Sequence, residues 1–171
     1  MLRTVQQAMN QFTQKICLGN KGIAIIEILI VIAIIVIAST AFMGIAVTSL
    51  KLSDSIKKAS IADFLMRDAV EIVRAFRNET DWEADGLGTL NTGISYYPQL
   101  GSNWSFLSGS ETIGNFTREI VFEDVSRDNN DNIENTYNPL NKDNNTKKVI
   151  VRVSWDSKSL ELITYLTNWM Q

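Results

Sequence analysis

The chain has no histidine, one cysteine and two prolines among its 171 residues. Without histidine, it lacks the commonest general base and the commonest metal ligand. The single thiol, Cys17, excludes both an internal disulfide framework and a cysteine metal site. The sequence also has no phosphate-binding glycine loop, and no pair of carboxylates stands out as an acid/base couple. We therefore predict that the chain is not an enzyme, has no catalytic residues and needs no cofactor.

Charge is almost absent from residues 23–50, where Glu27 is the only charged side chain. The apolar run over residues 23–43 holds 21 residues, and as a helix it would be about 31 Å long, the hydrocarbon thickness of a bilayer. A lone strand in lipid would leave its backbone groups without hydrogen bonds, so a helix is the only single-span solution. The sequence therefore predicts one membrane-spanning helix near the N-terminus.

The first 22 residues are polar and carry Arg3, Lys15 and Lys21 but no acidic residue, which gives them a charge of +3. The rest of the chain carries −6, because the whole chain carries −3. A basic flank before a membrane span favours retention on the cytoplasmic side, with the following part outside. An acidic body argues against binding to nucleic acid, which requires many lysines and arginines to neutralise phosphates.

Residues 51–78 have the pattern of an amphipathic helix. Apolar residues recur there every three or four positions, which predicts one dry face: Leu52, Ile56, Ala59, Ala62, Leu65, Ala69, Val73 and Phe76. Nothing between residues 43 and 51 demands a break. We therefore expect one helix of about 55 residues that begins in the membrane and ends near Asn78.

The C-terminal part predicts a small antiparallel sheet. Residues 79–115 look irregular with short strands, residues 116–125 form a strand candidate, and residues 126–146 look like a polar loop. Apolar and polar residues then alternate over two runs on either side of a four-residue polar turn, Asp156–Ser159, which is typical of a hairpin. The dry helix face is the available cover for this sheet, so we predict an α+β fold.

The junction Lys21-Gly22-Ile23, with Glu27 as the fifth residue after the glycine, resembles the processing site of type IV prepilins and of type II secretion pseudopilins. In that family a basic residue and a glycine precede the cut, and a glutamate is the fifth residue of the mature chain. Ile23 stands where Phe is usual. The resemblance implies cleavage after Gly22 by a prepilin peptidase and N-methylation of Ile23.

The resemblance also implies a pilin-like organisation: a cleaved leader (1–22), a transmembrane and filament-core helix (23–50), an amphipathic helix (51–78) and an extracytoplasmic head (79–171). The implied partners are other pilin or pseudopilin subunits and an inner-membrane assembly platform with its ATPase. The implied location is the cytoplasmic membrane, then an extracellular or periplasmic filament. The sequence leaves open pilus, pseudopilus or competence fibre, and a major or minor subunit, although a minor subunit suits it well.

Glu27 is costly in an apolar span and normally has a partner. Cleavage would create one, the free amine of Ile23, and in a staggered bundle the amine of a neighbouring subunit could pair with Glu27 and set the register. The alternative is a polar residue near the start of an ordinary signal anchor. The chain would then be a single-pass surface protein that binds a ligand and never polymerises.

The polar loop contains the start of a calcium-binding pattern. Asp128, Asn130 and Asn132 fit an EF-hand loop, but its sixth residue is Ile133 and its twelfth is Pro139, so an EF-hand is rejected. Some pseudopilins bind calcium in this region, which leaves a looser site as one interpretation. Its candidate ligands are Asp128, Asp131 and Asp143, and the alternative is a solvated, flexible loop.

Overall fold

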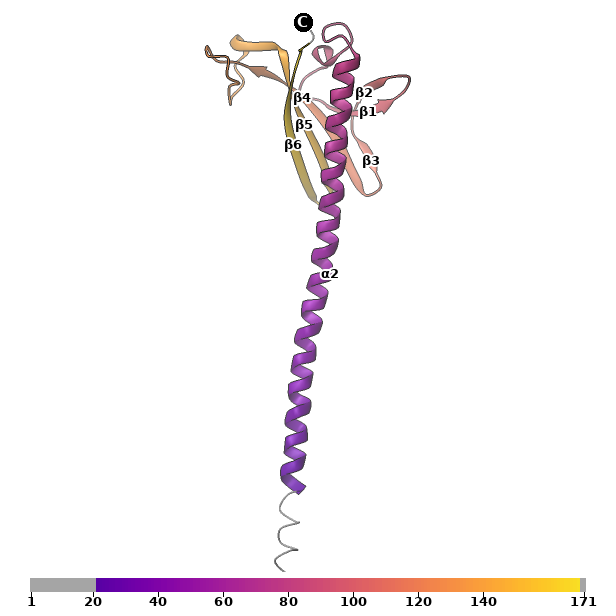
Figure 1. Ribbon diagram of the computed structural model, residues 1–171, viewed down its shortest axis with the longest axis vertical. Coiled ribbons are helices and arrows are strands. Elements are labelled where there is room, and N and C mark those ends of the chain that lie inside the picture. Colours follow the sequence, from indigo (N-terminus) through magenta and orange to yellow (C-terminus); the bar gives the residue numbers. More distant parts are fainter. Residues whose placement is uncertain (1–20, 170–171) are drawn as a thin grey trace, which may run out of the picture. The chain divides into compact units, whose positions relative to one another are not determined.

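The structure is a computed structural model that describes the backbone of residues 21–169 and the side chains from Ala24 to Trp169. This part contains one long helix and six strands, labelled in Figure 1: α2 (Lys21–Glu79), β1 (Ser95–Leu100), β2 (Trp104–Ser108), β3 (Glu111–Ile113), β4 (Phe116–Ser126), β5 (Lys142–Trp155) and β6 (Lys158–Thr167). Two short 3₁₀ turns, η1 (Leu87–Thr89) and η2 (Pro139–Asn141), lie in the connections. The chain divides between Asp54 and Ser55 into two compact units.

All strands pair antiparallel in one sheet with the order β2-β1-β4-β5-β6, and β3 pairs with β4 beside β1. The part of α2 that belongs to the second unit crosses one face of this sheet (Figure 1). The predicted α+β class, with a long N-terminal helix and a small antiparallel sheet, is confirmed.

The core forms between the sheet and the inner face of α2. Alternate residues of β4 and β5 point toward the helix, and the helix supplies buried residues every three or four positions from Ala62 to Phe76. Aromatic rings fill the gap, with Phe106 in edge-on contact with both Phe76 and Phe122 at centroid distances of 5.0 and 5.5 Å. Such ring geometry stabilises beyond the area that it buries.

The helix face that packs on the sheet begins later in the sequence than predicted. Leu52 and Ile56 were expected to face the sheet, but they are 62% and 60% exposed. Packing against the sheet core begins only at Ala59. The 3.6-residue pattern is the same on both sides of this point, so the sequence alone does not show where the cover begins.

The hairpin turn also differs from the prediction. Trp155 pairs directly with Lys158, so the turn has two residues, Asp156 and Ser157, and not four. Both have positive φ angles of 43° and 62°. This is the backbone of a type I′ turn, whose twist matches that of the flanking strands. The sequence lacks the usual Asn-Gly or Asp-Gly signal, which explains why the longer turn was predicted.

The predicted polar loop at residues 126–146 is partly strand, because β5 begins at Lys142. Lys142 and Asp143 pair with Ser126 and Val125 after a register shift in β4. An ion pair of 2.8 Å between Lys142 and Asp124 accompanies this extension. Polar pairing of this kind leaves no hydrophobic alternation in the sequence, which is why the strand start was missed.

Arg118 on β4 links the helix α2 to the sheet through ion pairs and a hydrogen bond. Its guanidinium, 5% exposed, donates to the Asp68 carboxylate at 2.7 Å, to the Glu111 carboxylate at 2.6 Å and to the Leu65 carbonyl at 3.0 Å. One buried cation therefore satisfies acceptors on α2 and on β3.

Replacing Arg118 with Ala should lower the free energy of unfolding by about 1.5–3 kcal/mol, because it removes charge-assisted hydrogen bonds from a buried guanidinium, while the Asp68 carboxylate, 46% exposed, stays solvated. The measurement is urea unfolding of the full chain in detergent, followed by tryptophan fluorescence, since all four tryptophans follow Ser55. Arg67→Ala is the matched control. Its pair with Asp63 is exposed on both sides, so its loss should change the stability little. Equal losses in both variants would contradict the role given to Arg118.

Candidate functional site

The predicted processing junction lies at the start of α2. The helix begins at Lys21, so the backbones of Gly22 and Ile23 are helical, while their side chains and residues 1–20 lie outside the described part. Cleavage after Gly22 and methylation of Ile23 therefore stay predictions. Over the described residues, α2 is the one helix that is long and apolar enough to cross a membrane.

Glu27 lies exposed on this helix. It makes no hydrogen bond or ion pair with any side chain in the described part of the chain. The next charged residue along α2 is Lys51, 24 positions later and about 36 Å away along the helix axis. A cation for Glu27 must therefore come from the N-terminal end of the chain or from another molecule.

The described residues leave the apolar surface around Glu27 uncovered. From Ile25 to Leu50 the large apolar side chains of α2 are between 45% and 75% exposed. A surface of this size is not stable in water, so lipid or other protein must cover it.

Exposed apolar side chains continue beyond the length that a bilayer covers. Leu52, Ile56, Ile61 and Phe64 are all exposed, and Phe64 is 67% exposed on the helix side opposite the sheet. After Phe64 the exposed positions of α2 are mainly charged, beginning with Arg67. The 3.6-residue period already leaves Phe64 outside the predicted dry face. The structure adds that no other described segment covers its ring.

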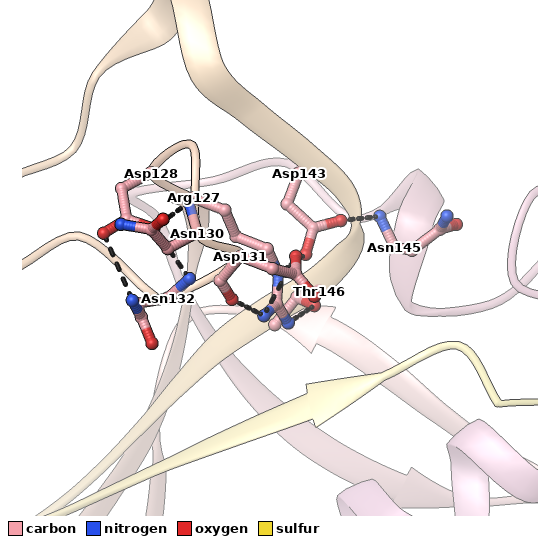
Figure 2. A network of polar contacts seen from close by, with 8 residues as sticks. All are labelled: Arg127, Asp128, Asn130, Asp131, Asn132, Asp143, Asn145 and Thr146. Atoms are coloured by element: carbon pink, nitrogen blue, oxygen red, sulfur yellow. Dashed lines mark hydrogen bonds and ion pairs between the residues drawn. The ribbon is translucent and has the colours of Figure 1, made fainter.

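The predicted calcium loop is organised by Arg127 (Figure 2). Its guanidinium donates to the Asp143 carboxylate at 2.7 Å, to the Asp131 carbonyl at 2.8 Å and to the Thr146 hydroxyl at 3.2 Å. The Asp131 carboxylate is 3.6 Å from the same guanidinium. Two of the three candidate ligands thus share a cation from the protein itself.

Asp128, the third candidate ligand, is used within its own turn. Its carboxylate accepts from the backbone amides of Asn130 and Asn132 at 2.8 and 2.9 Å, as Figure 2 shows. Hydrogen bonds from the Asn132 backbone and side chain, and from the Asn130 backbone, lower the pKa of Asp128. Within residues 24–169, no group of three carboxylates lies close enough to hold a metal ion. Calcium binding stays an untested prediction, and Arg127 is a functional residue of this loop that the sequence pattern did not reveal.

The basic residues of β5 are paired as well. Lys147 contacts Asp124 at 2.7 Å, Lys148 contacts Glu123 at 2.9 Å, and Arg152 bridges Glu119 and Glu161. Carboxylates of the neighbouring strands therefore neutralise these cations, and the absence of a nucleic-acid partner stays a prediction.

Comparison with protein-family models, with curated proteins and with solved structures finds no match for this chain. Its function must therefore be inferred from its own residues.

Arg127 should hold the loop in a pH-dependent way. Burial alone would raise the pKa of Asp143, but hydrogen bonds from Arg127, Thr146 and Asn145 hold it below its ordinary value. A carboxyl with a lowered folded pKa contributes stability above its unfolded pKa of about 3.9, and that stability is lost as the pH falls through the folded pKa. Arg127→Gln should therefore cost about 1–3 kcal/mol at pH 7 and much less at about pH 3.

The measurement is urea unfolding of both proteins at the two pH values, followed by tryptophan fluorescence. Arg74→Gln, which removes an exposed pair with Glu71, is the control and should change little at either pH. A cost that is the same at both pH values would contradict the ion-pair explanation.

Proposed function

We propose that this chain is a structural subunit, most simply a minor one, of a type IV pilus or of a related pseudopilus. A prepilin peptidase cuts the precursor after Gly22, and the new amine on Ile23 is methylated. The precursor is held in the cytoplasmic membrane with its leader inside and its head outside. An assembly platform and its ATPase then extract it into a filament, where the α2 helices bundle. The observation that carries this proposal is Glu27, a single carboxylate without a partner in an apolar helix.

On lenient insertion scales an unpaired charge costs about 2.5–3.5 kcal/mol at the bilayer centre. Glu27 lies one helical turn inside the span, where the cost is smaller but still favours a partner. The amine that cleavage creates at Ile23 is the nearest new cation in the sequence, one helical turn before Glu27. Within one chain this amine and Glu27 lie on the same helix. Between staggered helices, the amine of one subunit reaches the carboxylate of the next. The pair then fixes the register of the bundle more than it adds to its stability.

The extent of the uncovered apolar surface favours bundling over a simple anchor. About 20 residues are enough to cross the hydrocarbon layer. In α2, however, exposed apolar side chains run from Ile25 to Phe64. Residues up to Met43 are enough for a single bilayer crossing, so the exposed part beyond Met43 exceeds what a membrane anchor needs. Neighbouring α2 helices would cover this extra length, whereas a monomeric anchor would leave it in water.

The mass of the protein extracted from the membrane of its own cells tests the proposal directly. Loss of residues 1–22 together with the gain of one methyl group is the expected result. An uncut chain that begins at Met1 would overturn the proposal. It would favour instead the single-pass surface protein that binds a ligand and does not polymerise.

Replacing Glu27 with Gln or Ala should leave membrane insertion and cleavage intact, because the substitution makes the span more apolar. The variants should be absent from sheared filaments or strongly reduced there, because the register pair is gone. Immunoblots of membrane and filament fractions measure both results, and Glu27→Asp serves as the charge-preserving control. Normal incorporation of the Gln variant would rule out the pairing.

Phe64→Ala should leave the stability of the head unchanged, because the side chain is 67% exposed. Its incorporation into filaments should fall, because the ring would otherwise pack on a neighbouring helix. Leu100→Ala on β1 is the matched control, since Leu100 is 66% exposed but lies on the sheet. If both variants are incorporated equally, Phe64 has no part in the bundle.

A further inference from the structure

The sheet ends in an edge strand that is long and apolar. β6 is ten residues long and pairs only with β5 among the described strands. Ile163 and Tyr165 on this strand are 49% and 44% exposed. Natural proteins usually protect such an edge with charges, proline or a bulge. Here Glu161 is the one charged residue within the strand after Lys158, and Arg152 of β5 already binds it.

The hairpin fixes which backbone groups of β6 point away from β5. In a two-residue hairpin the closing pair, Trp155 and Lys158, is hydrogen-bonded, and such pairs then alternate along the strands. The bond from the Asn168 amide to the Asn145 carbonyl, ten residues further along, agrees with this alternation. The backbone groups that point outward therefore belong to the odd-numbered residues, Glu161, Ile163 and Tyr165 among them.

The sheet face opposite α2 carries an apolar row that runs to this edge. Val121 on β4 pairs with Ile150 on β5, which pairs with Ile163 on β6. Ion pairs flank this row on both sides, from Arg152 to Glu119 and Glu161 and from Lys148 to Glu123. The row ends at a half-exposed Ile163, so a further strand would continue it.

A second copy of β6 can pair with this edge in an antiparallel register centred on Thr164. Centring the pair on Thr164 places Ile163 opposite Tyr165 of the other copy, twice by symmetry, and Thr164 opposite itself. Aromatic pairs with β-branched residues and pairs of Thr residues both stabilise antiparallel strands. A pair centred on Glu161 would instead place two carboxylates opposite each other, which is unfavourable.

We propose that β6 is an interaction surface for a second copy of this chain, paired antiparallel and centred on Thr164. The contact is isologous, with the same residues on both sides. Main-chain hydrogen bonds of the odd-numbered residues provide the attraction, and Ile163 and Tyr165 fix the register.

The geometry restricts where this contact forms. β6 runs in the same direction as residues 55–79 of α2, because Lys158 at its start contacts Ser55, while Asn168 after its end lines a cavity with Arg77. The two-fold pairing therefore sets these helical segments of the two copies antiparallel. Subunits of one filament share one direction, so, if the proposed function holds, this contact joins heads of different filaments.

Disulfide trapping tests the pairing on the full chain in detergent, in a Cys17→Ser background. Opposing Cα atoms lie about 4.5 Å apart in non-hydrogen-bonded pairs, such as Thr164 with itself, and about 5.5 Å apart in hydrogen-bonded pairs, such as Ile163 with Tyr165. A disulfide can bridge both distances. Thr164→Cys should give a covalent dimer under mild oxidation. Ile163→Cys and Tyr165→Cys should cross-link when mixed, but neither alone. Leu140→Cys is the control for accessibility, because Leu140 is 92% exposed on η2 and lies outside the contact.

A second test needs no cross-linking. Ile163→Lys should raise the dimer dissociation constant, measured by sedimentation equilibrium, by about tenfold or more, which corresponds to about 1.4 kcal/mol. Its fluorescence-detected unfolding should stay close to wild type, which separates lost pairing from lost folding. The proposal is overturned if Thr164→Cys cross-links no more than Leu140→Cys. It is also overturned if Ile163→Cys alone forms a disulfide with a second copy of itself more efficiently than Thr164→Cys does. Glu27 and the mature N-terminus play no part in this experiment, so its failure would leave the proposed function untouched.

Discussion

The apolar surface of α2 is the constraint on which the rest of the structure depends. The sheet covers one face of this helix from Ala59 to Phe76, while the large apolar side chains from Ile25 to Leu50 are left exposed by the described residues. A membrane can cover about 20 residues of it. Exposed apolar side chains continue beyond that length to Phe64. In the proposed function, neighbouring α2 helices cover this remainder and provide the partner of Glu27 within the span. In this interpretation the subunits assemble because an apolar surface exposed to water is unfavourable.

In the sheet and the helix segment that covers it, ion pairs between elements hold many charged side chains in place. Arg118 is buried between the helix and the sheet, where it binds Asp68 and Glu111. On the opposite sheet face, Arg152 and Lys148 bind carboxylates of the neighbouring strands. Isolated surface pairs contribute little, but in these rows each charge has a fixed cross-strand partner.

The polar loop shows how a protein cation can organise carboxylates that would otherwise suggest a metal site. Arg127 binds Asp143 directly and lies near Asp131, while Asp128 is occupied by backbone amides of its own turn. A planar guanidinium offers several donors in a fixed geometry, so one side chain satisfies three neighbours. The acidic composition of the loop therefore does not by itself require calcium.

The sequence by itself determined the long apolar helix, the strand at residues 116–125, the final hairpin and the isolation of Glu27. Each rests on a local period or on composition, which a single segment carries alone. Tertiary structure decided where the helix becomes covered, so that Ile56 is exposed while Ala62 is buried. It also decided that Arg127 reaches Asp143 and that β6 lies at the sheet edge. These features depend on contacts between segments far apart in the chain, and no local pattern records them.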